Sequence, residues 1–128
     1  MELQGGIALG PPFSVNGAPT FHRAIIGGHL LESTSYTRNS RRNNFSVRTS
    51  RGLAIVEDFV AVKGILTAHV LFLQPVGPPS SICPTVRQYK TANRDQIAAS
   101  DILEGPLDTV KRHQDYFVVD FPLHLEGN

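Results

Sequence analysis

The amino-acid sequence predicts a small all-β protein, and three features of its 128 residues favour that class. The first is a content of 11 glycines and 9 prolines, which interrupt the chain too often for long helices. The second is a series of short runs rich in β-branched and aromatic residues. The third is the length, which suits one domain. We therefore expect six to seven short antiparallel strands with at most one short helix.

The first part of the chain divides at Thr20. Residues 1–19 are rich in glycine and proline, with only scattered apolar residues, so we expect a flexible N-terminal arm there. The domain itself is expected to span residues 20–126. It begins with apolar residues on both sides of the pair Gly27-Gly28, a pattern that predicts two short strands around a turn.

Residues 43–74 carry the clearest pattern. Asn43 to Ser50 alternates as a half-buried strand, Leu53 to Val62 is rich in β-branched residues, and Ile65 to Gln74 is apolar on both faces. Turns are expected near Arg51-Gly52 and Lys63-Gly64, which gives an antiparallel meander, and Glu57-Asp58 suggests a bulge or a change of sheet within it. The predicted core comprises Phe45, Val47, Ile55, Val70 and Phe72.

The rest of the chain is less regular. Pro75 to Ser81 predicts a surface loop, and Thr85 to Lys90 an edge strand. Gln96 to Leu103 is compatible with a helix or a strand and stays open. Leu107 to Lys111 and Tyr116 to Phe121 predict a final hairpin. Since closure removes exposed sheet edges, we expect a small, partly closed barrel of the SH3-like or OB-like kind.

Charge is distributed unevenly along the chain. No acidic residue lies between Glu32 and Glu57, so the arginines of that segment give it a charge of +5, and the remainder is net negative by 4 in a protein of net charge +1. An arginine can bind phosphate or carboxylate through two parallel contacts. A nucleic acid or an acidic protein tail is therefore the expected partner, unless the arginines pair with the acidic C-terminal half of the chain. The expected ligand-binding residues are Tyr36, Arg38, Arg41, Arg42, Arg48 and Arg51.

Signatures of catalysis and metal binding are missing from the sequence. The five histidines have no metal-ligand spacing, and one cysteine, Cys83, provides neither a disulfide nor a cysteine-rich zinc site. No serine lies in a nucleophile elbow, and the paired glycines lack the pattern of a phosphate loop. We expect no catalytic residue, no metal and no cofactor. Without a membrane span or a basic signal start, an intracellular protein with no membrane partner is expected.

Several segments resemble a poorly characterised β domain of transposon-derived eukaryotic proteins. There, a strand with a Ser-x-Ser-Tyr-like element precedes a basic Arg-Asn turn and another strand, as Leu30 to Tyr36 precedes Arg41 to Val47 here. Ala99 to Pro106 and Tyr116 to Pro122 look like its closing strands, and more loosely like those of bromo-adjacent homology barrels. The similarity covers about residues 20–126. It implies a recognition module near chromatin or nucleic acid, hence a nuclear location, and transfers no catalytic residue.

Three functions remain in competition. The first is a nonenzymatic module that presents the arginines between Arg38 and Arg51 to nucleic acid or to an acidic protein tail. The second is a small-molecule-binding or enzymatic barrel whose mouth is lined by Tyr36, His69 or Tyr116. The third is a structural assembly domain whose exposed strand edge adds to a partner. The sequence does not define the oligomeric state.

Overall fold

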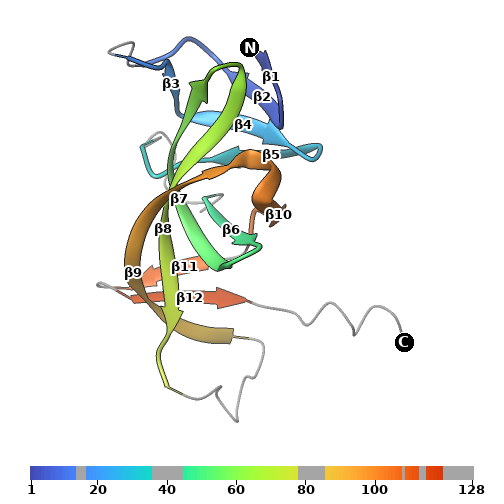
Figure 1. Ribbon diagram of the computed structural model, residues 1–128. Helices are drawn as coiled ribbons and strands as arrows, with labels where there is room; N and C mark the ends of the chain where they lie inside the picture. Colours follow the sequence, from blue (N-terminus) through green and yellow to red (C-terminus); the bar gives the residue numbers. More distant parts are fainter. Residues whose placement is uncertain (14–16, 36–44, 78–85, 108, 113–114, 120–128) are drawn as a thin grey trace.

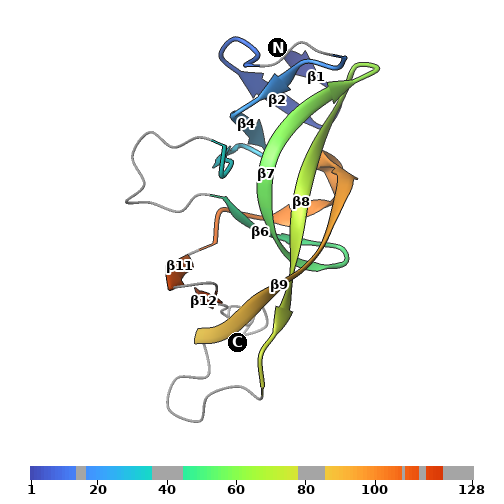
Figure 2. The ribbon, with the colours of Figure 1, turned by 90° about the vertical axis from the view of Figure 1, so that its left-hand side faces the viewer.

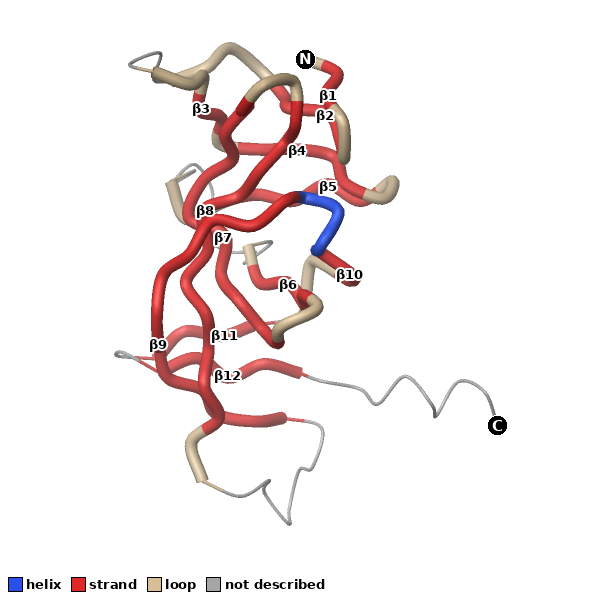
Figure 3. The backbone as a smooth tube through the Cα atoms, in the orientation of Figure 1, coloured by secondary structure: helices blue, strands red, loops and turns tan. Residues whose placement is uncertain are grey.

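The strands form two antiparallel sheets in the computed structural model, which describes residues 1–13, 17–35, 45–77, 86–107, 109–112 and 115–119 (Figure 1). The predicted all-β antiparallel class is confirmed. Within those residues the only helical element is a single 3-10 turn, Ala99–Asp101 (Figure 3), and no helix there could cross a membrane. The described residues contain twelve strands, where six or seven were expected for the chain. Both sheets are open, so the described strands do not close the expected barrel.

The first sheet has four strands in the order β1-β2-β4-β5. The predicted hairpin is confirmed, because β4 and β5 are joined by Gly27 and Gly28 alone, both with positive φ as such a tight turn requires. Two strands, β1 and β2, lie within residues 1–19, where a flexible N-terminal arm was expected. The strands are β1 Glu2–Leu3, β2 Gly6–Leu9, β4 Arg23–Ile26 and β5 His29–Glu32.

Contacts with distant parts of the chain explain why β1 and β2 form in a glycine-rich segment. The backbone of Gln4 donates to the carbonyl of Gly64 and accepts from the amide of Leu66, both at 2.9 Å. A Cβ on Gly6 would lie 2.6 Å from the Ile25 carbonyl oxygen and 2.8 Å from Leu66 Cδ2. Glycine is therefore required at position 6 by close packing, and the local composition alone does not indicate this.

The second sheet runs in the order β10-β6-β7-β8-β9-β12-β11, with β3 paired to β7. Figure 2 shows β7 and β8 as long, curved strands that run side by side along the molecule. The predicted meander is confirmed as β6, β7 and β8, and the predicted final hairpin as β11 and β12. The strands are β3 Thr20–Phe21, β6 Ser46–Thr49, β7 Gly52–Val62, β8 Ile65–Pro75, β9 Val86–Ala98, β10 Ile102–Glu104, β11 Thr109–Arg112 and β12 Asp115–Val119.

Strand β9 corrects the expectation for residues 85–90. It continues to Ala98 and pairs with β8 on one side and with β12 on the other, so it is a long interior strand and not a short edge strand. The open question about Gln96 to Leu103 is resolved as the end of β9, the 3-10 turn and β10. The expected loop after Pro75 lies largely outside the described residues.

Two hydrophobic cores lie on opposite faces of the long strands. Neighbouring residues of a strand point to opposite faces, so Ala54 belongs to the first core and Ile55 to the second. The first core is completed by the four-stranded sheet, and the second by β12 and Leu107. This two-sided burial explains the continuous apolar run of β7, whereas β8 alternates between buried and half-buried residues from Leu66 to Leu71. Of the predicted core residues, Val47, Ile55, Val70 and Phe72 are buried, whereas Phe45 is only partly buried against the second core.

The predicted irregularity at Glu57-Asp58 is confirmed as a bulge in β7. Val56 pairs with Val70, and the next pair along the strands is Asp58 with His69, so Glu57 is an extra residue. A bulge changes the direction of the side chains that follow it and increases the local twist. As a result, Glu57 and Asp58, although adjacent in the strand, both line one hollow with His69.

Candidate functional site

Arg51 occupies the turn between β6 and β7, and two contacts define the position of its side chain. The guanidinium Cζ lies 4.6 Å from the centroid of the Phe72 ring, a cation–π arrangement. Its Nη1 lies 2.9 Å from Asp95 Oδ2. The Arg51 side chain remains 52% exposed. The arginine is therefore held in one orientation while much of it stays accessible to a partner.

Asp95 is the acidic partner in this arrangement. The backbone N–H of Gln96 donates to Asp95 Oδ1 at 2.7 Å. This hydrogen bond, followed by that from Arg51, stabilises the charged form and lowers the pKa of Asp95 below its ordinary value. The carboxylate therefore stays ionised at neutral pH and keeps its contact with Arg51.

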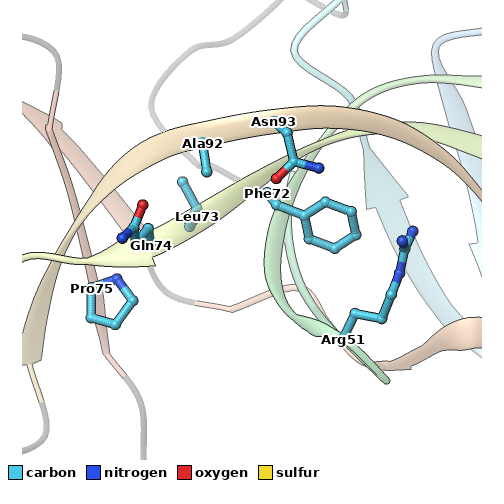
Figure 4. A pocket seen from close by; sticks show the side chains of 7 residues that line it. All are labelled: Arg51, Phe72, Leu73, Gln74, Pro75, Ala92 and Asn93. Atoms are coloured by element: carbon cyan, nitrogen blue, oxygen red, sulfur yellow. The ribbon is translucent and has the colours of Figure 1, made fainter.

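A bulge in β9 opens a hollow next to Arg51. Ala92 and Asn93 both lie opposite the single residue Phe72, between the pair Leu71–Arg94 and the pair Leu73–Thr91. The hollow has a volume of about 350 Å³. Figure 4 shows Arg51 reaching it from the β6–β7 turn, whereas the other lining side chains come from β8 and β9. The lining residues are Arg51, Phe72, Leu73, Gln74, Pro75, Ala92 and Asn93.

Of the other predicted site residues, only Arg48 lies in the described part of the chain. Arg48 lies on β6, where its Nε is 3.4 Å from Glu104 Oε2 on the neighbouring strand β10. Arg48 and Arg51 thus both contact acidic residues of the later part of the chain, as the alternative interpretation of the arginines expects. The remaining four, Tyr36, Arg38, Arg41 and Arg42, lie outside the described residues.

Two other hollows are lined by His69 and Tyr116, two residues of the small-molecule-binding or enzymatic hypothesis. His69 Nδ1 donates a hydrogen bond of 2.5 Å to Asp58 Oδ1, and both residues line a hollow of about 400 Å³. Tyr116 lines a neighbouring hollow of about 360 Å³. Glu57 and Arg94 border both hollows and form an ion pair of 3.0 Å. The side chain of His69 is 43% exposed, and the residue as a whole is half-buried at the boundary of the fold.

A hydroxyl network joins the chain before β4 to the chain after β5. Ser35 Oγ lies 2.8 Å from His22 Nδ1 and 2.5 Å from Ser33 Oγ, which donates to the His22 carbonyl at 2.7 Å. The ring of Phe13 stacks on that of His22 with a centroid distance of 3.9 Å. The sequence showed no motif for this serine–histidine contact. Because Ser33 is buried and bonded to the backbone, the network ties two segments of the fold together.

The outer face of the four-stranded sheet carries the exposed apolar residues most relevant to the assembly hypothesis. Ile7, Ile25 and Leu30 are successive cross-strand neighbours, and Ile7 and Leu30 are 37% and 41% exposed.

The hollow beside Arg51 combines a cation, an aromatic ring, two side-chain amides and apolar walls. Such a set suits a planar polar ligand better than a metal ion. In the described part of the chain, no group of three or more His, Cys, Asp or Glu side chains is placed to hold a metal. Comparison of the chain with protein-family models, with curated proteins and with solved structures finds no match.

Proposed function

We propose that this protein is a nonenzymatic recognition module that binds nucleic acid through the arginines of residues 38–51. The observation that carries the proposal is the run of five arginines without an intervening acidic residue in a chain that is otherwise net negative. Clustered arginines neutralise phosphates and release condensed counterions, which is the main source of sequence-independent affinity. The sequence resemblance to a domain of transposon-derived proteins points in the same direction.

The internal ion pairs of Arg48 and Arg51 are compatible with this function. Both pairs are partly exposed, and the side chain of Glu104 is 42% exposed. Exposed ion pairs contribute only about 0–1 kcal/mol to stability, because solvent screens them and side-chain entropy opposes them. Phosphate oxygens can therefore replace the Glu104 carboxylate on Arg48 at little cost, since a guanidinium binds either group through the same contacts.

The proposal is tested by removing two arginines of the segment together. Arg41→Ala with Arg42→Ala should weaken binding to a labelled duplex and to a labelled single strand at low salt, as measured by fluorescence anisotropy. A matched control removes two positive charges elsewhere, Lys63→Asn with Arg94→Ala. Asparagine is chosen because Lys63 has a positive φ, which asparagine tolerates. The control should bind more tightly than the arginine variant.

Two results would contradict the proposal. Equal affinity of the wild type and the Arg41/Arg42 variant for both probes would remove these arginines from the binding surface. Binding of a labelled polyglutamate peptide without binding of either nucleic acid would assign the segment to an acidic protein tail instead. Loss of thermal stability in the same variant would indicate that the arginines serve mainly as internal partners of acidic residues.

A second candidate function is supported by the hollows of His69 and Tyr116. Their common border, the Glu57–Arg94 pair, makes one continuous polar surface of the kind that could hold a small molecule. The acidic residues of this surface, Glu57, Asp58 and Asp95, outnumber its one arginine, Arg94. The surface is therefore a poor match for an anionic ligand. Arg94→Ala with His69→Ala would abolish small-molecule binding at this surface, and unchanged binding would exclude it.

A further inference from the structure

We infer that the hollow beside Arg51 holds one unstacked nucleobase, so that the protein prefers single-stranded to fully paired nucleic acid. This inference rests on the proposed function and specifies the substrate class of the same surface. It depends on three observations: the flat support that Arg51 forms, the two amides at the rim, and the size and surroundings of the hollow.

The guanidinium of Arg51 provides a flat surface on which a planar ligand can stack. Its Cζ lies 4.6 Å from the centroid of the Phe72 ring, and Nη1 contacts Asp95 Oδ2 at 2.9 Å, so the side chain has contacts on two sides. Because the side chain is still 52% exposed, the guanidinium can accept a planar ligand from the solvent side. Bases stack on arginine planes as well as on aromatic rings. A base stacked on this guanidinium would lie close to the Phe72 ring as well.

The rim of the hollow offers groups that match the edge of a base. Gln74 and Asn93 are both exposed, and each amide supplies hydrogen-bond donors and an acceptor. Leu73, Pro75 and Ala92 add apolar surface between them. An isolated inorganic anion would leave this apolar surface unused, and a purely aliphatic ligand would leave the amides unpaired. A nucleobase, which is flat and bears polar groups only along its edge, uses both.

The dimensions and the neighbouring charge agree with a nucleotide. A hollow of about 350 Å³ lies at the small end of the range for ligand sites, which suits a single base better than a stacked pair. Lys90 is exposed and is the cross-strand neighbour of Gln74, so its ammonium group can meet a phosphate next to the bound base. Bases of an intact duplex are stacked and paired, and they would have to leave the helix to enter.

The decisive experiment distinguishes binding through the bases from binding through the phosphates. The probes are a single strand of mixed sequence, an abasic strand with the same number of phosphates, and the duplex of the first strand. We expect the wild type to bind the base-bearing strand about 5- to 10-fold more tightly than the abasic strand, the effect of stacking one base. Arg51→Lys keeps the charge but loses the plane, so it should bring this ratio close to one, and Asn93→Ala should reduce it. Arg23→Lys on β4, the matched control, makes the same change at a residue that does not line this hollow, and it should leave the ratio unchanged.

Each outcome separates the inference from the proposed function. Equal binding of the base-bearing and abasic strands by the wild type would overturn the base site and leave phosphate binding by the arginines intact. An unchanged ratio in a folded Arg51→Lys variant would do the same, because charge alone would then suffice. Failure of the wild type to bind any of the three probes would overturn the proposed function and the base site together.

Discussion

Truncation of Phe59 and of Phe72 to alanine should destabilise the protein by clearly different amounts. Both rings belong to the first core and lie on adjacent strands. Phe59 is 0% exposed and its cross-strand neighbour is the buried Phe21, so its removal leaves an enclosed cavity. Phe72 is 8% exposed and borders the hollow beside Arg51, so water and the arginine side chain can occupy the vacated space.

Replacing a buried phenylalanine by alanine costs about 3–5 kcal/mol, with the larger costs at sites that cannot collapse. We expect Phe59→Ala near the upper end of that range and Phe72→Ala near the lower end, although the latter also loses a cation–π contact of about 0.5–1 kcal/mol. Both losses are large, because small domains are stable by only about 5–15 kcal/mol.

Urea unfolding followed by far-ultraviolet circular dichroism measures both values, since the chain has no tryptophan for a fluorescence signal. If Phe59→Ala does not fold, Phe59→Leu and Phe72→Leu provide the same comparison. A loss of unfolding free energy at Phe72 equal to or greater than that at Phe59 would refute the reasoning, because it would mean that the hollow is closed around the Phe72 ring.

Other predictions concern the first sheet and the surface charges. Gly6→Ala should lower the free energy of unfolding by about 1–3 kcal/mol through overpacking, whereas Ile7→Ala on the exposed face should change it by less than about 0.5 kcal/mol, both measured by thermal unfolding. Arg94→Ala should cost less than about 1 kcal/mol in urea unfolding, since its ion pair is exposed. The pKa of Asp95, followed by NMR, should lie below its ordinary value and rise in Arg51→Ala. Because the folded pKa is the lower one, the stabilising contribution of this carboxylate is present above about pH 4 and is lost as the pH falls through the folded pKa.

The parts of the fold that could be predicted are those in which local signals agree. Alternation and turn-forming residues specified the meander, and the pair Gly27-Gly28 specified the hairpin of the first sheet. In contrast, β9 contains Arg94, Asp95 and other polar residues that read locally as loop or helix. Pairing with strands on both sides makes β9 a strand, and that pairing is a long-range property of the chain.

The candidate site could be predicted only in part for the same reason. Arg51 was identified from charge alone, because a run of arginines is visible in the sequence. Phe72 was expected only as a core residue, and nothing local connects it with Asn93 or Asp95. These residues meet because β8 and β9 pair in a register that contains a bulge. Of the bulges in β7 and β9, only the one at Glu57, where two acidic residues interrupt an apolar strand, could be predicted from the sequence.

The salt dependence of binding tests the central claim, recognition of nucleic acid by the arginine-rich segment, most directly. For duplex DNA, the logarithm of the association constant should fall linearly with the logarithm of the salt concentration, with a slope of about −0.9 for each neutralised phosphate. With two to four contacts we expect a total slope of about −2 to −4, and a smaller magnitude for Arg41→Ala with Arg42→Ala. A slope near zero, or the same slope in the wild type and in that variant, would contradict the account.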